Sequence, residues 1–352
     1  MHLCAPGEEQ DLKDELARVF PASQHAEYSP GWLQSELTAE DSIREPVLGF
    51  ARQVLPYARL IEAESISQWA RQVVDFAIER GDVRPDASTD AGPWRLHVFG
   101  IPVPGGSAGP RRTALVAKRI DEELLERRRR LARRRTADTA AAWSVEESLL
   151  QVGLVSATQG YLSWASPALR GLVRHVLSRY PGGETPLPER NLEAPSRAFA
   201  KLVEAQAHFG RSIAPGEVCV DLGSSPGGWA YVALEQGARV IAVDRSPLAP
   251  AMMKHPKLEF HQGDAFRFTP ASRVDWLLCD VAAFPQKTLA MLKEWLVARR
   301  CLRFVVTVKF RGREDYPIVG EFAALLAPHA GEYSIRRLAS NKNEVTVMGE
   351  LI

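Results

Sequence analysis

The pattern of hydrophobic and polar positions changes near the middle of this chain. From residue 196 onward, short apolar runs of strand length alternate with segments whose apolar residues recur at helical spacing. The runs predict strands at 217–222, 239–243, 258–262, 274–279, 303–308, 333–338 and 344–348, and helices at 196–209, 229–235, 286–299 and 316–326. Continuous apolar strands that alternate with helices indicate a mainly parallel sheet covered on both faces, which is an α/β fold. The last two strands leave no room for a helix between them, so we expect an antiparallel hairpin at one edge.

The first half of the chain has a weaker pattern. Residues 94–103 alternate as a strand does, 111–135 have apolar residues at helical spacing, and 146–165 predict one or two strands around a turn. These features indicate a small α+β region. Residues 180–197 are rich in proline, glycine and charge and lack periodicity, which is typical of a linker. We therefore expect two domains, at 1–185 and 186–352.

Composition restricts the possible partners and the compartment. Hydrophobic residues make up 45% of the 352 positions and the formal net charge is +1, so any nucleic-acid surface must be a local patch. Three of the four cysteines fall in or beside apolar strand-like runs, where buried thiols are common, and no pair has the spacing of a disulfide framework or zinc site. The eight histidines show no metal-ligand spacing, and no apolar run has the length of a membrane span. We expect a cytoplasmic protein, monomeric, without a metal or a membrane partner.

The turn "GSSPGG", at Gly223–Gly228, follows the first strand of the predicted sheet and precedes a helix. Ligands of open α/β sheets bind beyond the carboxyl ends of the strands, where glycines permit close approach and a helix N-terminus offers N–H donors. The dinucleotide fingerprint G-x-G-x-x-G is not met, and Pro226 removes a phosphate donor. A nucleoside without pyrophosphate fits better, and S-adenosylmethionine is the common cofactor of that kind. A nucleotide-dependent oxidoreductase and a turn without a ligand are the alternatives.

Acidic residues lie at or just after the ends of the first four predicted strands, at Asp221, Asp244, Asp264 and Asp280. Aspartate is common in turns, but four at one sheet edge indicate a site. We expect Asp244 to accept hydrogen bonds from both hydroxyls of a ribose, and Asp264 from an adenine amino group. The fifth strand ends in Lys309 after four β-branched residues. This lysine is either an edge residue that reaches solvent or a base placed beside a methyl donor.

The segment "DLGSSPGGWA" resembles the D-L-G-x-x-P-G-G-W signature of the FtsJ-like RNA ribose 2′-O-methyltransferases. That family carries a Lys-Asp-Lys-Glu tetrad, which the motifs "SRAFAKL", "LLCD", "VTVKF" and "NEVTV" match at Lys201, Asp280, Lys309 and Glu344. The resemblance covers residues 195–352. It implies a Rossmann-like S-adenosylmethionine-dependent methyltransferase sheet, with a cofactor site at Gly223, Ser225, Pro226, Gly227, Gly228, Trp229, Asp244, Asp264 and Asp280.

The resemblance also implies roles for the tetrad. Lys309 is implied as the base that removes the proton of the ribose hydroxyl, with Asp280 and Glu344 holding the lysines. A buried lysine beside another cation has a lowered pKa, so we expect Lys201 and Lys309 to lower each other's pKa. A carboxylate paired too closely with a lysine would instead raise that lysine's pKa, so the geometry decides.

Within the family, the likeness is greatest to the RlmM type, which methylates a cytidine ribose of large-subunit ribosomal RNA. The extended turn D-L-G-x-x-P-G-G-W-x-Y and the terminal "EVTV" carry this likeness. That type has an N-terminal THUMP module, so residues 1–185 are expected to be a THUMP-like RNA-binding region. The implied partner is ribosomal RNA. A tRNA ribose methyltransferase and a non-catalytic RNA-binding protein with a degenerate methyltransferase fold are the alternatives.

Several segments are candidates for RNA contact. The run "RRRRLARRR", at Arg127–Arg135, is either a phosphate-binding patch or the solvated end of a helix. Trp143, Tyr161 and Trp164 either stack on unpaired bases or belong to the core. The segment "RGRED", at Arg311–Asp315, either contacts a substrate phosphate or forms a solvated loop.

Overall fold

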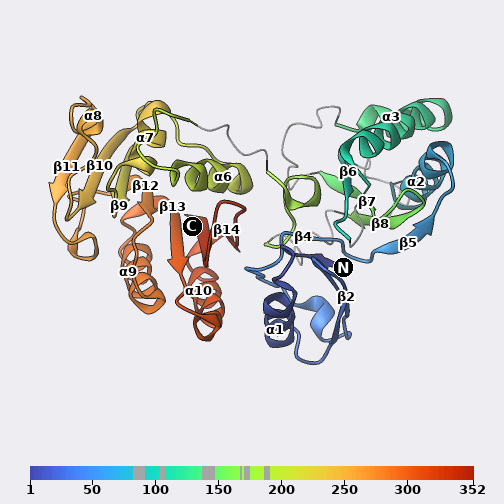
Figure 1. Cartoon of the computed structure of the whole chain (residues 1–352), viewed down its shortest axis with the longest axis horizontal. Coiled ribbons are helices and arrows are strands. Elements are labelled where there is room, and N and C mark those ends of the chain that lie inside the picture. The colour runs from blue at the N-terminus through green and yellow to red at the C-terminus, as the bar shows by residue number, and fades with distance from the viewer. Residues whose placement is uncertain (82–91, 104–107, 137–146, 167–168, 170–174, 186–190) are drawn as a thin grey trace. The chain divides into compact units, whose positions relative to one another are not determined.

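The computed structural model describes the whole chain except residues 82–91, 104–107, 137–146, 167–168, 170–174 and 186–190 (Figure 1). The chain forms two compact units, Met1–Glu184 and Thr185–Ile352. The boundary between these units falls within the proline- and glycine-rich segment 180–197. All four cysteines are buried as free thiols. Among the described residues, we find no helix with the length and hydropathy of a membrane span.

The C-terminal unit is built on one seven-stranded sheet with the order β11-β10-β9-β12-β13-β15-β14. The strands are β9 (Val218–Leu222), β10 (Arg239–Asp244), β11 (Leu258–Gln262), β12 (Val274–Cys279), β13 (Cys301–Lys309), β14 (Ala330–Arg336) and β15 (Glu344–Leu351). Strands β9 to β13 are parallel, whereas β15 runs antiparallel to both β13 and β14. The predicted α/β sheet and its antiparallel edge hairpin are therefore confirmed.

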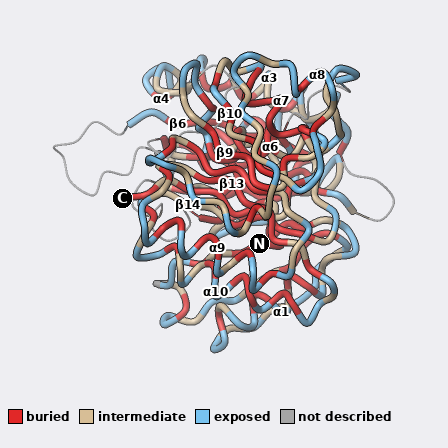
Figure 2. Tube along the Cα trace, turned by 90° about the vertical axis from the view of Figure 1, so that its left-hand side faces the viewer, coloured by how far each residue is buried: buried red, intermediate tan, exposed pale blue. Residues whose placement is uncertain are grey.

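Helices cover both faces of this sheet (Figure 1). Helices α6 (Phe199–Phe209), α7 (Gly228–Glu235) and the short α8 (Pro250–Met253) pack on one face, and α9 (Pro285–Val297) and α10 (Ile318–Leu326) lie on the other. Leu202, Trp229 and Ala233 from α6 and α7 share a buried cluster with Cys219, Leu278 and Val305 of the strands. The central strands are mainly apolar because both of their faces are covered, as the buried positions along β9, β10 and β13 in Figure 2 show.

One boundary in this unit differs from the prediction in a way that affects the site. Helix α6 begins at Phe199 rather than at residue 196. Ser196 and its neighbours instead pack against the glycine turn, since a Cβ atom at Gly228 would collide with the Ser196 hydroxyl. The indole N–H of Trp229 donates to the Ala198 carbonyl at 2.8 Å and holds the start of α6 beside the turn.

The N-terminal unit contains two four-stranded sheets. The first is antiparallel with the order β2-β3-β1-β4, and helix α1 (Glu9–Val19) belongs to the same part of the chain. Its strands are β1 (His2–Leu3), β2 (Gln24–Ser29), β3 (Trp32–Glu36) and β4 (Gln53–Val54). The sequence pattern did not predict this sheet, because strands of two residues have no measurable periodicity.

The second sheet of the N-terminal unit has the order β5-β8-β7-β6. Its strands are β5 (Arg59–Glu62), β6 (Trp94–Gly100), β7 (Ser148–Leu154) and β8 (Gln159–Ala165), and the strands predicted at 94–103 and 146–165 are thereby confirmed. Helices α2 (Ile66–Gly81) and α3 (Pro110–Arg127) share a buried cluster with β6, β7 and β8.

The helical character predicted for 111–135 is confirmed, but the segment forms two helices rather than one. Helix α3 ends at Arg127, Arg128 has φ −145° and ψ 68°, and α4 (Arg129–Arg134) follows. The break allows Leu131 to be buried and Arg135 to form an ion pair with Asp121 of α3 at 2.6 Å. Four successive like charges also weaken a continuous helix at this point.

Candidate active site

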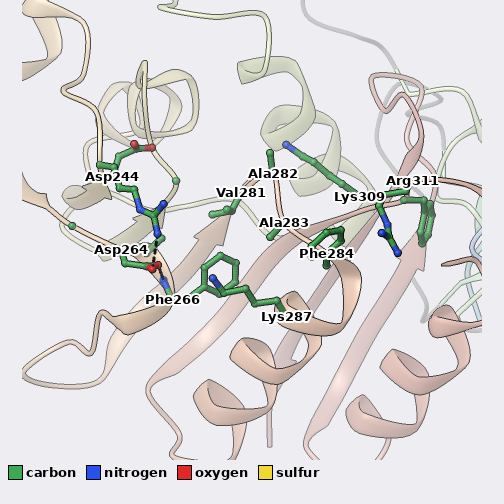
Figure 3. Close-up of a pocket in the computed structure, with 15 residues that line it drawn as sticks. Asp244, Asp264, Phe266, Val281, Ala282, Ala283, Phe284, Lys287, Lys309 and Arg311 are labelled. Atoms are coloured by element: carbon green, nitrogen blue, oxygen red, sulfur yellow. Dashed lines mark hydrogen bonds and ion pairs between the residues drawn. The ribbon is translucent and has the colours of Figure 1, made fainter.

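The candidate site lies where the five parallel strands β9 to β13 end at a common edge of the sheet. Two adjoining lobes of a cavity open there, of about 550 and 440 Å³, and both are lined by Gly223, Asp244, Val281, Ala282 and Lys309. The outer lobe adds Asp264, Phe266, Phe284, Lys287 and Arg311 (Figure 3). The inner lobe adds the glycine turn with Asp221, Asp280 and Trp229. The carboxylates at the strand ends thus lie at one edge of the sheet, as the sequence predicts.

The glycine turn uses backbone conformations that other residues rarely adopt. Gly223 has φ +74° and Gly227 has φ +114°. A Cβ atom at Gly223 would lie 2.5 Å from a methyl group of Val281, so a side chain here would displace the loop after β12. The Ser225–Pro226 bond is cis. The turn thus lies close against the loop that carries Asp280 and Val281.

Asp244, at the end of β10, binds the glycine turn with one carboxylate oxygen and the segment after β10 with the other. Oδ2 accepts the Ser225 N–H at 3.0 Å, and Oδ1 accepts the Ser246 N–H at 2.8 Å. Each carboxylate oxygen has a second lone pair, so both remain able to accept a hydroxyl hydrogen from a ligand. The predicted role toward a ribose is compatible with this arrangement.

Asp264 lies at the same end of the outer lobe as Asp244 (Figure 3). Its Oδ1 accepts the Phe266 N–H at 3.0 Å, and its Oδ2 forms an ion pair with Arg245 at 2.8 Å. The backbone hydrogen bond from Phe266, followed by the contact with Arg245, lowers the pKa of Asp264. The carboxylate is therefore kept ionised and is able to accept from an amino group.

Asp221 is a buried carboxyl group that lines the inner lobe and that the sequence left without a role. It is 1% exposed and accepts the Ser224 hydroxyl at 2.5 Å. Burial raises its pKa to about 7, although hydrogen bonds from Ser224 and the Ala230 backbone act in the opposite direction. A buried acid of this kind at a ligand edge gains stability from a cationic partner.

We expect Asp221→Asn to stabilise the protein in the absence of ligand. The folded pKa is about 7 against an ordinary 3.8. The folded state therefore binds more protons than the unfolded state between these values, and wild-type stability falls as the pH rises through this window. The variant should be more stable by on the order of 2 kcal/mol at about pH 8 and no more stable at about pH 4. Urea denaturation at both pH values checks this, and an equal difference at both would contradict it.

The tetrad residues meet around the carboxylate of Asp280. The Lys201 amine lies 3.2 Å from each oxygen of Asp280 and 2.6 Å from Oε1 of Glu344. The Lys309 amine lies 3.0 Å from Oδ1 of Asp280 and donates to the backbone carbonyl of Asp280 at 2.8 Å. The sequence motifs that hold these four residues are up to 143 positions apart, and the fold brings them within hydrogen-bond distance.

Two neighbours that the sequence did not identify complete this network. Thr307 donates to Oδ1 of Asp280 at 2.6 Å, and Asn341 donates to Oε1 of Glu344 at 3.3 Å. Thr307 lies two residues before Lys309 on β13 and therefore on the same face of the strand. This period of two is the sequence signal that could have identified Thr307 as a site residue. Lys309 and Glu344 are direct partners in the antiparallel register of β13 and β15.

The pKa of Lys201 differs from the expectation. Partial burial favours the neutral amine, but Asp280 and Glu344 outweigh it, so the pKa of Lys201 is raised above its ordinary value. The prediction that a neighbouring lysine lowers the pKa of Lys201 is therefore wrong. Two carboxylates lie within 3.2 Å of its amine, and they stabilise the protonated form. Lys201 stays cationic at neutral pH.

The two lysines also differ in position relative to the cavity. Lys309 lines both lobes and its side chain is 28% exposed. Lys201 and Glu344 are 14% and 5% exposed, and neither lines the lobes. Among the tetrad, Asp280 and Lys309 are thus placed to touch a ligand, and Lys201 and Glu344 lie behind Asp280.

Glu204, one turn after Lys201 on α6, fastens the turn that precedes β15. Its carboxylate accepts N–H groups of Ala339 and Ser340 at 2.7 and 2.9 Å and the Ser340 hydroxyl at 2.6 Å. Burial alone opposes its ionisation, but these bonds and His208 outweigh burial and lower the pKa of Glu204 to about 2. Helix α6 therefore positions both Lys201 and the segment that leads into Glu344.

The candidate RNA-contacting residues of the N-terminal unit divide into two groups. Tyr161 is buried and Trp164 packs against the core cluster of the second sheet, which favours the core interpretation for both, and Trp143 lies outside the described residues. Of the arginine run, Arg127 and Arg135 form ion pairs with Asp75 and Asp121. Arg129, Arg130 and Arg133 are exposed and form no ion pair with any residue that the structure describes.

No group of three or more His, Cys, Asp or Glu side chains is arranged to hold a metal ion within the described part of the chain.

Comparison with known proteins assigns a class to the C-terminal unit. Residues 194–308 match the model of the family described as FtsJ-like methyltransferase. The family resemblance predicted from the motifs is confirmed, and the C-terminal unit carries an FtsJ-like methyltransferase domain. The mixed α/β sheet described above agrees with this assignment.

Curated relatives share the name "Ribosomal RNA large subunit methyltransferase M". The protein of that name from Alkalilimnicola ehrlichii is 35% identical over 163 residues, which cover 44% of this chain and 45% of the relative. The one from Halorhodospira halophila is 35% identical over 157 residues, which cover 44% of this chain and 46% of the relative. The match therefore spans less than half the length of these relatives.

A solved structure titled a possible methylase, from Clostridium difficile 630, is 13% identical and covers 99% of this chain and 97% of its own. Its TM-score is 0.33.

Proposed function

We propose that this protein is an S-adenosylmethionine-dependent RNA ribose 2′-O-methyltransferase that acts on a cytidine of large-subunit ribosomal RNA. The observation that carries the proposal is the Asp280 carboxylate, which joins Lys201 and Lys309 beside a cavity at the ligand edge of the sheet. The names of the relatives favour ribosomal RNA over the alternative of tRNA. The alternative of a nucleotide-dependent oxidoreductase gives no role to Lys201, Lys309 or Glu344.

The cavity fits S-adenosylmethionine by the chemistry of its lining. Asp244 offers two acceptor oxygens for a ribose, and Asp264 offers an acceptor for an adenine amino group. The buried Asp221, whose pKa is raised to about 7, suits the cofactor's ammonium group, because a cation nearby stabilises its ionised form. When bound, this cofactor supplies a methyl group activated by a positively charged sulfur.

Lys309 is the residue we assign as the base. A ribose 2′-hydroxyl holds its proton far above neutral pH, so a base must remove this proton during attack. A neutral lysine amine has two N–H donors and one lone pair. The carbonyl and Oδ1 of Asp280 are acceptors for both donors, which leaves the lone pair for the hydroxyl proton.

Lys201 supports this assignment through charge. It stays protonated and balances Asp280 and Glu344, so the two carboxylates do not have to be compensated by Lys309. Thr307 fixes the same oxygen of Asp280 that contacts Lys309. Catalysis then depends mainly on holding the hydroxyl oxygen in line with the methyl donor and within hydrogen-bond reach of Lys309.

We also propose that the protein is cytoplasmic. We assign the N-terminal unit to RNA binding, as a THUMP-like module. The exposed arginines of α4, Arg129, Arg130 and Arg133, support this assignment, because a local cationic surface binds phosphates on a molecule of nearly neutral net charge.

Transfer of a labelled methyl group tests the function and the cofactor site together. The protein is incubated with methyl-labelled S-adenosylmethionine and an unmodified transcript of large-subunit ribosomal RNA, and 2′-O-methyl positions are mapped. We expect one methylated cytidine. Asp244→Ala should weaken cofactor binding about 10- to 100-fold by calorimetry, because the variant loses the ribose acceptors. Methylation of a tRNA pool with no product on the ribosomal transcript would contradict the assigned substrate, and unchanged cofactor binding would contradict the role of Asp244.

A further inference from the structure

In the outer lobe, beside Lys309, the guanidinium group of an arginine stacks on an aromatic ring. The guanidinium carbon of Arg311 lies 4.4 Å from the centre of the Phe284 ring (Figure 3). Phe284 follows the loop after β12 and precedes α9, and Arg311 follows β13 by two residues. Both line the outer lobe together with Lys309. The neighbouring strands β12 and β13 therefore present this pair at the ligand edge of the sheet.

Phe284 is not placed there by core packing. The residue is 56% exposed, and among the described residues of the C-terminal unit it is the only strongly exposed aromatic. Large aromatic side chains usually bury most of their area, so an exposed ring next to a cavity indicates contact with something else. Pro285 follows it and fixes the chain direction at this point.

Arg311 contacts Asp315 and the Phe284 ring, and its terminal nitrogens stay available. The buried carboxylate of Asp315 accepts the Arg311 backbone N–H at 2.8 Å and lies 3.7 Å from Nε. The side chain of Arg311 is 62% exposed, and its guanidinium donates no hydrogen bond to a residue within the described ranges. With the guanidinium over the Phe284 ring and Nε nearest to Asp315, both Nη groups remain available to a ligand.

The loop that carries Arg311 is fixed to the start of β15. Phe310 donates its N–H to the Asn343 carbonyl at 2.9 Å and accepts the Asn343 side chain at 3.0 Å, and the Tyr316 hydroxyl donates to Asn343 at 3.0 Å. Asn343 directly precedes Glu344. The position of Arg311 relative to Lys309 and Glu344 is thereby determined by hydrogen bonds on both sides of the loop.

At the opposite end of the outer lobe, the cationic side chains already have partners. Arg245 is there paired with Asp264 at 2.8 Å, and Lys287 lies 4.0 Å from the centre of the Phe266 ring, next to the carboxylates expected to bind the cofactor. Arg311 is the guanidinium at the Lys309 end (Figure 3). It therefore lies away from the carboxylates expected to bind the cofactor (Figure 3).

We infer that Arg311, stacked on Phe284, binds the phosphate adjoining the target ribose and so places the 2′-hydroxyl at Lys309. This inference rests on the proposed function. In RNA, the 2′-hydroxyl is on the carbon next to the one that bears the 3′-phosphate, so every ribose offered to Lys309 brings a phosphate with it. A guanidinium binds a phosphate through two parallel N–H bonds, and a stacked, oriented guanidinium loses less entropy in doing so. Arg311 is a binding residue in this role, and it takes no proton.

Arg311→Ala tests the inference by separating RNA affinity from chemistry. We expect the KM for the ribosomal transcript to rise about 10- to 100-fold, while kcat and the Kd of S-adenosylmethionine change less than about threefold. The slope of log Kd against log salt for a short single-stranded RNA oligonucleotide should decrease in magnitude by about 0.7, the value for one lost phosphate contact. Arg311→Lys should restore this slope but only part of the KM, because a lysine keeps the charge without the planar fork. Phe284→Leu should raise the KM several-fold with a smaller change in slope.

Arg313→Ala is the matched control, since Arg313 is an exposed arginine of the same loop that does not line the lobe. It should leave the KM and the salt slope as in the wild type. An Arg311→Ala variant with wild-type KM and slope, or a loss of the same size in Arg313→Ala, would overturn the inference. The oligonucleotide measurement needs no turnover. If the wild-type protein transfers no methyl group to RNA, the proposed function fails, and an unchanged slope in Arg311→Ala separately refutes the phosphate contact.

Discussion

Replacing Lys309 with methionine is expected to lower the rate of methyl transfer about a thousandfold, because the ribose hydroxyl loses its base. The rate is measured in a single turnover at saturating cofactor, so that binding and product release do not contribute. Methionine keeps most of the length and apolar volume of the lysine side chain. Asp280 retains Lys201 as a partner in this variant, so the free energy of unfolding should change by less than about 1 kcal/mol.

Two further measurements decide whether the loss belongs to the base. The Kd of S-adenosylmethionine should stay within about threefold of the wild type, because the residues assigned to ribose and adenine are untouched. Lys293→Met, which removes an exposed lysine of α9, is the matched control and should transfer at the wild-type rate. A Lys309→Met variant that retains a tenth or more of the wild-type rate would exclude Lys309 as the base.

Replacing Lys201 with methionine is expected to destabilise the fold by about 3 kcal/mol and to abolish transfer. The substitution leaves the carboxylates of Asp280 and Glu344, which are 14% and 5% exposed, without the cation between them. Removing one partner of a largely buried ion pair is costly because the remaining charge is not solvated. Urea denaturation gives the free energy of unfolding, and the midpoint should fall without a change in slope.

The pH dependence and a second variant distinguish this explanation from a simple packing defect. Because folding raises the pKa of Lys201 above the ordinary 10.5, its contribution is complete below that pH and is lost only as the pH rises through the raised value. The deficit of Lys201→Met should therefore be constant between about pH 6 and 9. Lys201→Met combined with Glu344→Leu should recover most of the stability and none of the activity. A double variant as unstable as the sum of its parts would indicate packing alone.

The α/β sheet could be predicted from the sequence because its central strands are buried on both faces and therefore form nearly continuous apolar runs. The edge hairpin followed from the short spacing between its strands. The first sheet of the N-terminal unit could not be predicted, since β1 and β4 have two residues each and are held by partners distant in sequence. The break between α3 and α4 is accompanied by the pairing of Arg135 with Asp121, a contact that helical spacing alone does not reveal.

The candidate site could be predicted in part for a related reason. Parallel strands end at one edge, so the strand-end residues Asp244, Asp280 and Lys309 were identifiable from strand boundaries alone. The approach of Lys201 and Glu344 was implied only by family resemblance, because it depends on helix packing and on the register of an antiparallel strand. The raised pKa of Lys201 could not be inferred either, since it depends on distances of about 3 Å that a sequence does not contain.

The pairing of Lys309 with Glu344 across β13 and β15 has a consequence for how this protein tolerates mutation. Side chains alternate between the two faces of a strand, so shifting β15 by one position would turn Glu344 away from Lys201 while the backbone ladder could still form. A single insertion or deletion in the connection at 337–343 that shifts this register would thus remove Glu344 from the network around Asp280 and would also displace the buried side chains of β15. In this connection length matters more than composition, and natural variation there should consist of substitutions rather than gaps.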